Sequence, residues 1–64
     1  GVTVYVYKFV ITYSNGHVRN EWICSESGES TADLKCRADE YLDEIEQDES
    51  VRSVTMTRRI VPGI

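Results

Sequence analysis

The side chains of this chain that could carry out covalent or metal chemistry are one histidine, two cysteines and eleven carboxylates. A Cys–His dyad requires its two side chains to lie about 3 Å apart. His17 lies in a predicted hairpin turn, whereas Cys36 lies early in a predicted helix that begins at the far end of the second strand. We therefore expect most of a strand's length to separate them, which excludes a dyad.

The surroundings of the cysteines also argue against catalysis. Cys36 lies among Asp33, Asp39 and Glu40, and nearby anions disfavour a reactive thiolate. We expect Cys24 to point into the core and Cys36 away from it, beyond disulfide reach. One histidine and two such cysteines do not build a zinc site. Paired carboxylates need a pocket that separates their pKa values, and no Gly-rich phosphate loop is present. The sequence thus predicts a non-enzymatic protein without a metal or cofactor.

The charge of the chain is strongly segregated along the sequence. Ten acidic and two basic residues lie between Glu26 and Glu49, whereas the rest of the chain has one acidic and five basic residues. The net charge is −4. Segregated charge bears on partners and association rates rather than on fold.

The length and cysteine content set further bounds. A chain of 64 residues forms one small domain, residues 1–64, with a single core. No apolar run reaches the roughly 18 residues of a membrane span, and no basic stretch precedes an apolar region as in a signal peptide. Two cysteines are too few for a disulfide framework, which predicts a cytoplasmic protein with free thiols.

The first half of the chain is typical of a β-hairpin. Residues 2–13 are mostly β-branched and aromatic, and residues 17–25 form a second strand. Asn15-Gly16 suits a two-residue type I′ turn. That turn pairs Tyr13 with Val18, Ile11 with Asn20, Phe9 with Trp22, and Tyr7 with Cys24. These bulky residues share one face with Tyr5, which we expect to be the core face.

The second half predicts a helix followed by a strand. Ser30-x-x-Asp33 marks the start of a helix over residues 30–50, and residues 51–61 return to strand character. The apolar stripe of the helix is Leu34, Ala38, Tyr41, Leu42 and Ile45. The predicted fold is α+β in the order β-β-α-β, with a three-stranded antiparallel sheet of order 2-1-3 and the helix packed on one face. The predicted buried residues are Phe9, Ile11, Trp22, Leu34, Leu42, Ile45, Val54 and Met56.

The acidic helix is the leading candidate contact surface. Its like charges at i,i+4 and its acids near the C-terminus carry a local energetic cost. A plain interpretation is a solvated face that keeps the protein soluble. The functional interpretation is an interaction module, such as an inhibitor or regulator, that docks this helix on the basic surface of a nucleic-acid-handling protein. Its contact residues would be Asp39, Glu40, Asp43, Glu44 and Glu46.

Two alternatives use the sheet face that the helix leaves uncovered. The first is a nucleic-acid-binding module that uses Lys8, Arg19, Arg58 and Arg59. Sheet-face binders of this kind usually present aromatic side chains for stacking, and here the aromatics are expected in the core. The second alternative is a homodimeric structural protein joined through Val6, Val10 and Ile23.

Overall fold

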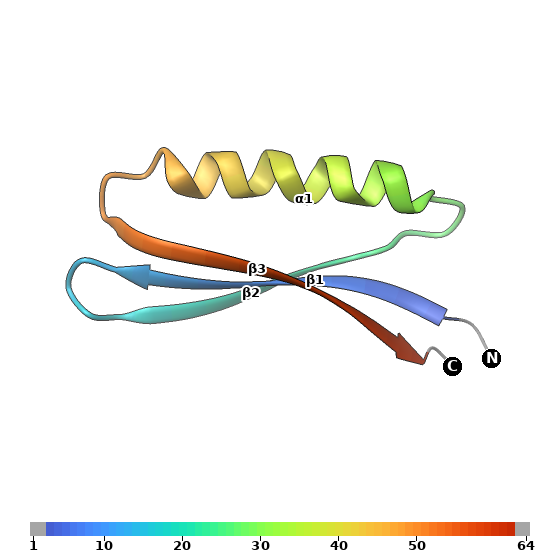
Figure 1. The fold of residues 1–64 in the computed structure, drawn as a ribbon, viewed down its shortest axis with the longest axis horizontal. Coiled ribbons are helices and arrows are strands. Elements are labelled where there is room, and N and C mark those ends of the chain that lie inside the picture. Colours follow the sequence, from blue (N-terminus) through green and yellow to red (C-terminus); the bar gives the residue numbers. More distant parts are fainter. Residues whose placement is uncertain (1–2, 63–64) are drawn as a thin grey trace.

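The chain forms a three-stranded sheet with one helix along one of its faces. The computed structural model describes residues 3–62, with β1 (Thr3–Tyr13), β2 (Val18–Cys24), α1 (Thr31–Glu46) and β3 (Val51–Pro62). The strands are antiparallel in the order β2-β1-β3, and α1 runs along the sheet (Figure 1). The predicted α+β fold and strand order are confirmed. Val2 and Gly63, which the sequence placed in the first strand and after the third, lie outside the described residues.

The core lies between α1 and the centre of the sheet. Its buried side chains are Tyr7, Phe9 and Ile11 from β1 and Leu34, Ala38 and Ile45 from α1. Phe9 is fully buried and meets the ring of Tyr41 edge to face, with centroids 5.0 Å apart. The aromatic face of β1 is therefore the core face, as predicted. Three further predicted core residues are only partly buried and pack against this cluster: Leu42, Val54 and Met56.

The hairpin turn differs from the predicted one. The Tyr13 N–H donates to the His17 carbonyl at 2.8 Å, and the Gly16 N–H donates to the Tyr13 carbonyl at 2.9 Å. The loop therefore holds three residues, 14–16. Gly16 has a φ of 90°, whereas Asn15 keeps a negative φ. A type I turn closed by a left-handed glycine is the usual three-residue hairpin loop, whereas a type I′ turn would need a positive φ at both central residues.

This extra loop residue shifts the register of the hairpin by one position. Lys8 lies opposite Trp22, and Tyr7 lies opposite Ile23. A shift of one residue turns every side chain of a strand to the other face. Trp22 is therefore 56% exposed, whereas Ile23 is half-buried against the core. The predicted pairing of Phe9 with Trp22 and the predicted burial of Trp22 are wrong.

The same shift corrects the other three predicted pairs. Ile11 lies opposite Arg19 rather than Asn20. The Tyr13 N–H donates a hydrogen bond to the His17 carbonyl, so Tyr13 lies opposite His17 rather than Val18. Tyr7 no longer faces Cys24, which is exposed on the face away from the helix. The prediction that Cys24 points into the core is therefore also wrong.

The helix begins as predicted and ends earlier. The Ser30 hydroxyl accepts a hydrogen bond from the Asp33 N–H at 3.1 Å, which caps the first turn. The helix ends at Glu46 because the Asp48 carboxylate accepts from the Ser50 N–H at 2.9 Å and from its hydroxyl at 2.6 Å. Such a local side-chain turn competes with helical bonding. Asp48 therefore lies outside the helix. One carboxylate fewer then lies in the last turn of α1, where the helix dipole disfavours negative charge.

The corrected register makes a prediction about stability. Phe9→Ala should lower the free energy of unfolding by about 3 to 5 kcal/mol, because a fully buried ring is removed. Trp22→Ala should cost less than about 1 kcal/mol, because the indole is largely exposed and only a surface contact with Lys8 is lost. Urea denaturation followed by circular dichroism measures both, with Phe9→Leu as a milder core variant. Equal costs for the Trp22 and Phe9 substitutions would contradict the register.

Candidate functional site

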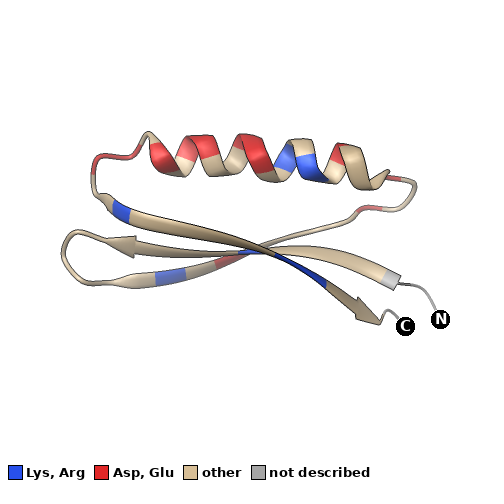
Figure 2. Cartoon of the chain, viewed as in Figure 1, with Lys and Arg blue, Asp and Glu red and all other residues tan. Residues whose placement is uncertain are grey.

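The acidic residues of α1 are concentrated in its second half (Figure 2). Glu40, Asp43, Glu44 and Glu46 are all exposed. Among the described residues, no cation lies within ion-pairing distance of any of these four carboxylates. We call Glu40, Asp43, Glu44 and Glu46 the acidic row. The last turn of α1 holds no basic residue, so nothing on the helix itself offsets the row there.

The fifth predicted contact residue, Asp39, differs from the acidic row. Its carboxylate accepts a hydrogen bond from the Lys35 ammonium at 2.8 Å. The two residues are one turn apart, and the hydrogen bond to Asp39 raises the pKa of Lys35. Asp39 is also half-buried, whereas the members of the acidic row are exposed. Asp39 therefore contributes less unpaired charge to this surface than the sequence suggested.

The other base of the helix, Arg37, is held by Glu29 in the loop before α1. The Arg37 Nε donates to one Glu29 oxygen at 2.6 Å, and a terminal nitrogen donates to the other at 2.8 Å. The same terminal nitrogen donates to the Cys24 carbonyl at 2.9 Å. This bidentate ion pair, together with the hydrogen bond that the Glu26 N–H donates to the carboxylate, lowers the pKa of Glu29 from 4.5 to about 2. We call these contacts of Arg37 the Glu29–Arg37 clamp. They connect the end of β2 to α1.

The four basic residues of the nucleic-acid hypothesis are not brought together. Lys8 lies opposite Thr57 and Arg59 lies opposite Val6, which places both on the face away from the helix. Arg58 lies opposite Tyr7, on the helix side. Arg19 lies opposite the buried Ile11, also on the helix side, where it pairs with Glu21 at 3.3 Å. The structure thus splits the predicted set between the two faces.

The face away from α1 is here called the open face. It consists of the even-numbered residues of β1 from Val4 to Thr12, the even-numbered residues of β2 from Val18 to Cys24, and the odd-numbered residues of β3 from Ser53 to Val61. It carries Lys8 and Arg59, and no Asp or Glu among these residues. The Lys8 ammonium lies 5.9 Å from the centre of the Trp22 ring. Sequence reasoning missed Trp22 on this face because the turn length was misassigned.

The predicted dimer face is only partly formed. Val6 and Val10 lie on the open face, and both are half-buried by their neighbours in the sheet. Ile23 lies opposite Tyr7, on the helix side, and packs against the core. Ile23 therefore cannot take part in a contact made by the open face. Trp22, rather than Ile23, lies on the open face.

The histidine and cysteines stay apart from one another in the fold. His17 follows the hairpin loop, Cys24 ends β2 on the open face, and Cys36 is exposed on α1. Both cysteines are free thiols. Within residues 3–62, no group of three or more His, Cys, Asp or Glu side chains is arranged to hold a metal ion. In that same part of the chain, the helix is too short and too polar to cross a bilayer.

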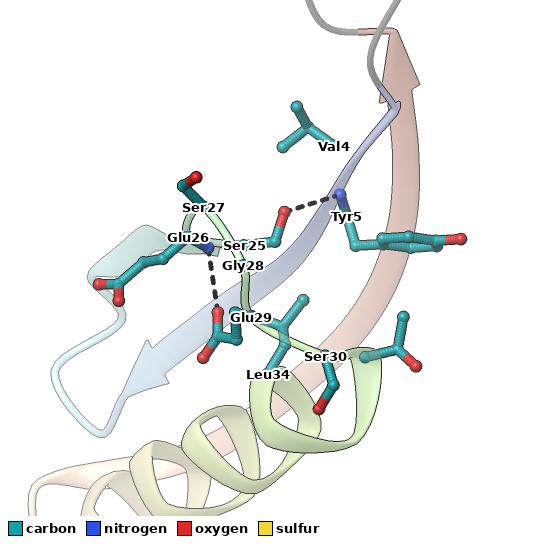
Figure 3. Close-up of a pocket in the computed structure, with 10 residues that line it drawn as sticks. Val4, Tyr5, Ser25, Glu26, Ser27, Gly28, Glu29, Ser30 and Leu34 are labelled. Carbon is teal, nitrogen blue, oxygen red and sulfur yellow. Dashed lines mark hydrogen bonds between the residues drawn. The ribbon is translucent and has the colours of Figure 1, made fainter.

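A hollow of about 450 Å³ lies between the start of β1 and the loop that leads into α1 (Figure 3). The Ser25 hydroxyl accepts from the Tyr5 N–H at 3.3 Å, and the Glu26 N–H donates to Glu29 at 3.0 Å. Gly28 has a φ of 78°, a left-handed conformation that favours glycine. The lining includes Val4 and serine residues but neither a cysteine nor a histidine. It also includes Glu26 and Glu29, but among the described residues no hydrogen bond joins a hydroxyl of this lining to a carboxylate.

Comparison of the chain with protein-family models, with curated proteins and with solved structures gives no match. The candidate contact surfaces of the described residues are the acidic row of α1 and the open face of the sheet.

The Glu29–Arg37 clamp predicts how stability changes with acid. The pKa of Glu29 is about 2 in the folded chain, below the ordinary 4.5, so ionised Glu29 stabilises the fold. That contribution is complete above the ordinary pKa and is lost as the pH falls toward the folded value. Glu29→Gln should therefore be less stable than the unmodified protein near about pH 6, and the difference should shrink as the pH falls to about 2.5. Chemical denaturation of both proteins across this range measures the difference.

All other acidic residues are common to the two proteins, so their titration largely cancels in the comparison. A difference in stability that stays constant from neutral to acid pH would contradict the clamp.

Proposed function

We propose that this chain is a small non-enzymatic interaction module that binds a basic protein surface through the acidic row of α1. The observation that carries the proposal is that Glu40, Asp43, Glu44 and Glu46 are exposed and unpaired among the described residues. The two bases of the helix are already committed elsewhere, Lys35 to Asp39 and the other to the loop before α1. The row is therefore left to interact with charges supplied by another molecule.

The shape of the row suits such a partner. It spans seven residues of a helix, from Glu40 to Glu46, or about 9 Å at a rise of about 1.5 Å per residue. Its carboxylates are held on a backbone that the packed core makes rigid. A row of fixed negative charge on a rigid element raises the rate of association with a positively charged surface. A protein surface that normally holds nucleic-acid phosphates is rich in Lys and Arg, and it is the class of partner that this charge fits best.

An inhibitor or regulator of a nucleic-acid-handling protein is the form of this function that the size and charge support. An acidic row that occupies a phosphate-binding surface competes with nucleic acid for the same cations. The two free thiols suit a reducing compartment, and we place the interaction in the cytoplasm. The competing interpretation is that the row only keeps the protein soluble. In that case, neutralising the row would affect no specific partner.

A charge-matched pair of variants tests the proposal. The row variant carries Glu40→Gln, Asp43→Asn and Glu44→Gln. Its fold should be intact or more stable by a few tenths of a kcal/mol, because like charges at i,i+4 are relieved. Both variants and the unmodified chain are used as baits in extracts of the native host, followed by quantitative mass spectrometry. We expect a basic protein that the unmodified chain captures to be lost with the row variant.

The control variant changes three acids that lie outside the acidic row: Glu26→Gln, Asp33→Asn and Glu49→Gln. Its net charge equals that of the row variant, so a general effect of charge would reduce capture by both. We expect the control to retain the partner, and we expect the captured complex to dissociate as salt rises. Equal capture by the row variant and the unmodified chain would reject the proposal and leave solubility as the role of the row.

A further inference from the structure

The open face exposes most of the large apolar surface of the molecule. Four large hydrophobic side chains are strongly exposed among the described residues, and Val18, Trp22 and Val61 of these lie on the open face. Val18 and Val61 lie toward opposite ends of this face, opposite Thr12 and Val4, whereas Trp22 lies opposite Lys8 with the half-buried Val6 and Val10 on either side. Exposed apolar patches mark contact sites more often than single apolar residues do. Tryptophan is also enriched among the residues that dominate binding energy at interfaces. The face therefore has the composition of a surface that another molecule covers.

The position of Lys8 restricts the chemistry of that molecule. Lys8 lies between Val6 and Val10 along β1 and directly opposite Trp22 on β2. A partner that covers the two valines must also cover the lysine. A buried ammonium group is costly unless an anion or several acceptors meet it. Arg59 of β3 lies opposite Val6 of β1, so a partner that covers Val6 must also supply an anion or acceptors to Arg59. The open face itself holds no carboxylate among the described residues to satisfy either cation.

The width of the sheet indicates the shape of the occupant. Strands lie about 4.8 Å apart, so the centres of the two outer strands are separated by about 10 Å. That width matches the diameter of one helix with its side chains, about 10 Å. The other face of this sheet is already covered by a single amphipathic helix, α1, whose second half is rich in acidic residues (Figure 2). A second helix on the open face would give the three-layer packing of many α and β domains.

We propose that the open face binds an amphipathic acidic helix of a partner protein, with apolar side chains on Trp22, Val6 and Val10 and carboxylates on Lys8 and Arg59. This binding goes beyond the function proposed for the acidic row, because it uses the opposite side of the molecule and charge of the opposite sign. The chain would then join a basic partner on one side to an acidic partner on the other.

Two other occupants fit the open face less well. A second copy placed face to face would bring Lys8 and Arg59 of both chains together without a carboxylate from either open face, which buried charges do not tolerate. Single-stranded nucleic acid would find two cations but only one aromatic ring, Trp22, and that ring already has the Lys8 ammonium over it. Bases stack on aromatic side chains, whereas much of this face is valine.

The only tryptophan of the chain reports directly on the open face. The probe is a tryptophan-free peptide of about 18 residues with leucines at i, i+3, i+4 and i+7, glutamates beside them, and alanine or glutamine elsewhere. We expect it to shift the Trp22 emission to shorter wavelength in a saturable way. The double variant Lys8→Gln and Arg59→Gln should bind it about tenfold more weakly. The variant of the acidic row should bind it unchanged, which separates this proposal from the preceding one.

The matched control peptide carries lysine at each glutamate position and should not bind. The proposal is overturned if the glutamate peptide produces no shift at millimolar concentration, or if the lysine peptide binds equally well. Quenching of Trp22 by a short oligothymidine at low salt, without a response to the glutamate peptide, would instead assign the face to single-stranded nucleic acid. An emission that changes with protein concentration alone would assign it to a second copy.

Discussion

The three-residue loop of the hairpin is the constraint on which the surface of this protein depends. Gly16 takes a left-handed conformation that closes a type I turn, and the Tyr13 N–H then meets the His17 carbonyl. That single closure sets which residue of β2 lies opposite each residue of β1. It turns Trp22 outward and Ile23 inward. A loop shorter by one residue would exchange the two, leaving a sheet with an uncovered face of a different composition.

The two sides of this thin molecule carry net charges of opposite sign. The open face carries Lys8 and Arg59 without an acid among the described residues, whereas α1, on the other side of the sheet, carries the acidic row (Figure 2). The core between them is apolar and small, centred on Phe9 and Leu34. The two basic residues of α1 form ion pairs within the chain: Lys35 with Asp39, and Arg37 with Glu29 of the loop before the helix. Each side thus keeps a net charge of one sign for contact with another molecule.

Much of the fold could be predicted because its signals are local and mutually consistent. The β-branched first strand, the Ser30 cap and the apolar stripe of the helix each agree with the structure. The turn could not be predicted reliably, because Asn-Gly suits both a two-residue and a three-residue loop and the choice depends on backbone geometry. The end of the helix was missed for a similar reason. Aspartate disfavours the helix interior only modestly, and the hydrogen bonds that Asp48 accepts from Ser50 favour a turn after Glu46.

Whether the structure keeps a predicted set of residues on one surface depends on how far that set relied on the register. The predicted contact set of the helix does not depend on the register, and four of its five residues, the acidic row, are exposed and unpaired among the described residues. The basic and dimer sets include residues of β2, and the shift of one residue moved Arg19 and Ile23 to the helix side. The register of β1 and β2 therefore decides the composition of both faces of the sheet, and nuclear Overhauser contacts of the Trp22 indole in labelled protein measure it. Contacts with the Lys8 methylenes are expected, whereas contacts with Phe9 and Leu34 would show that Trp22 lies on the core face.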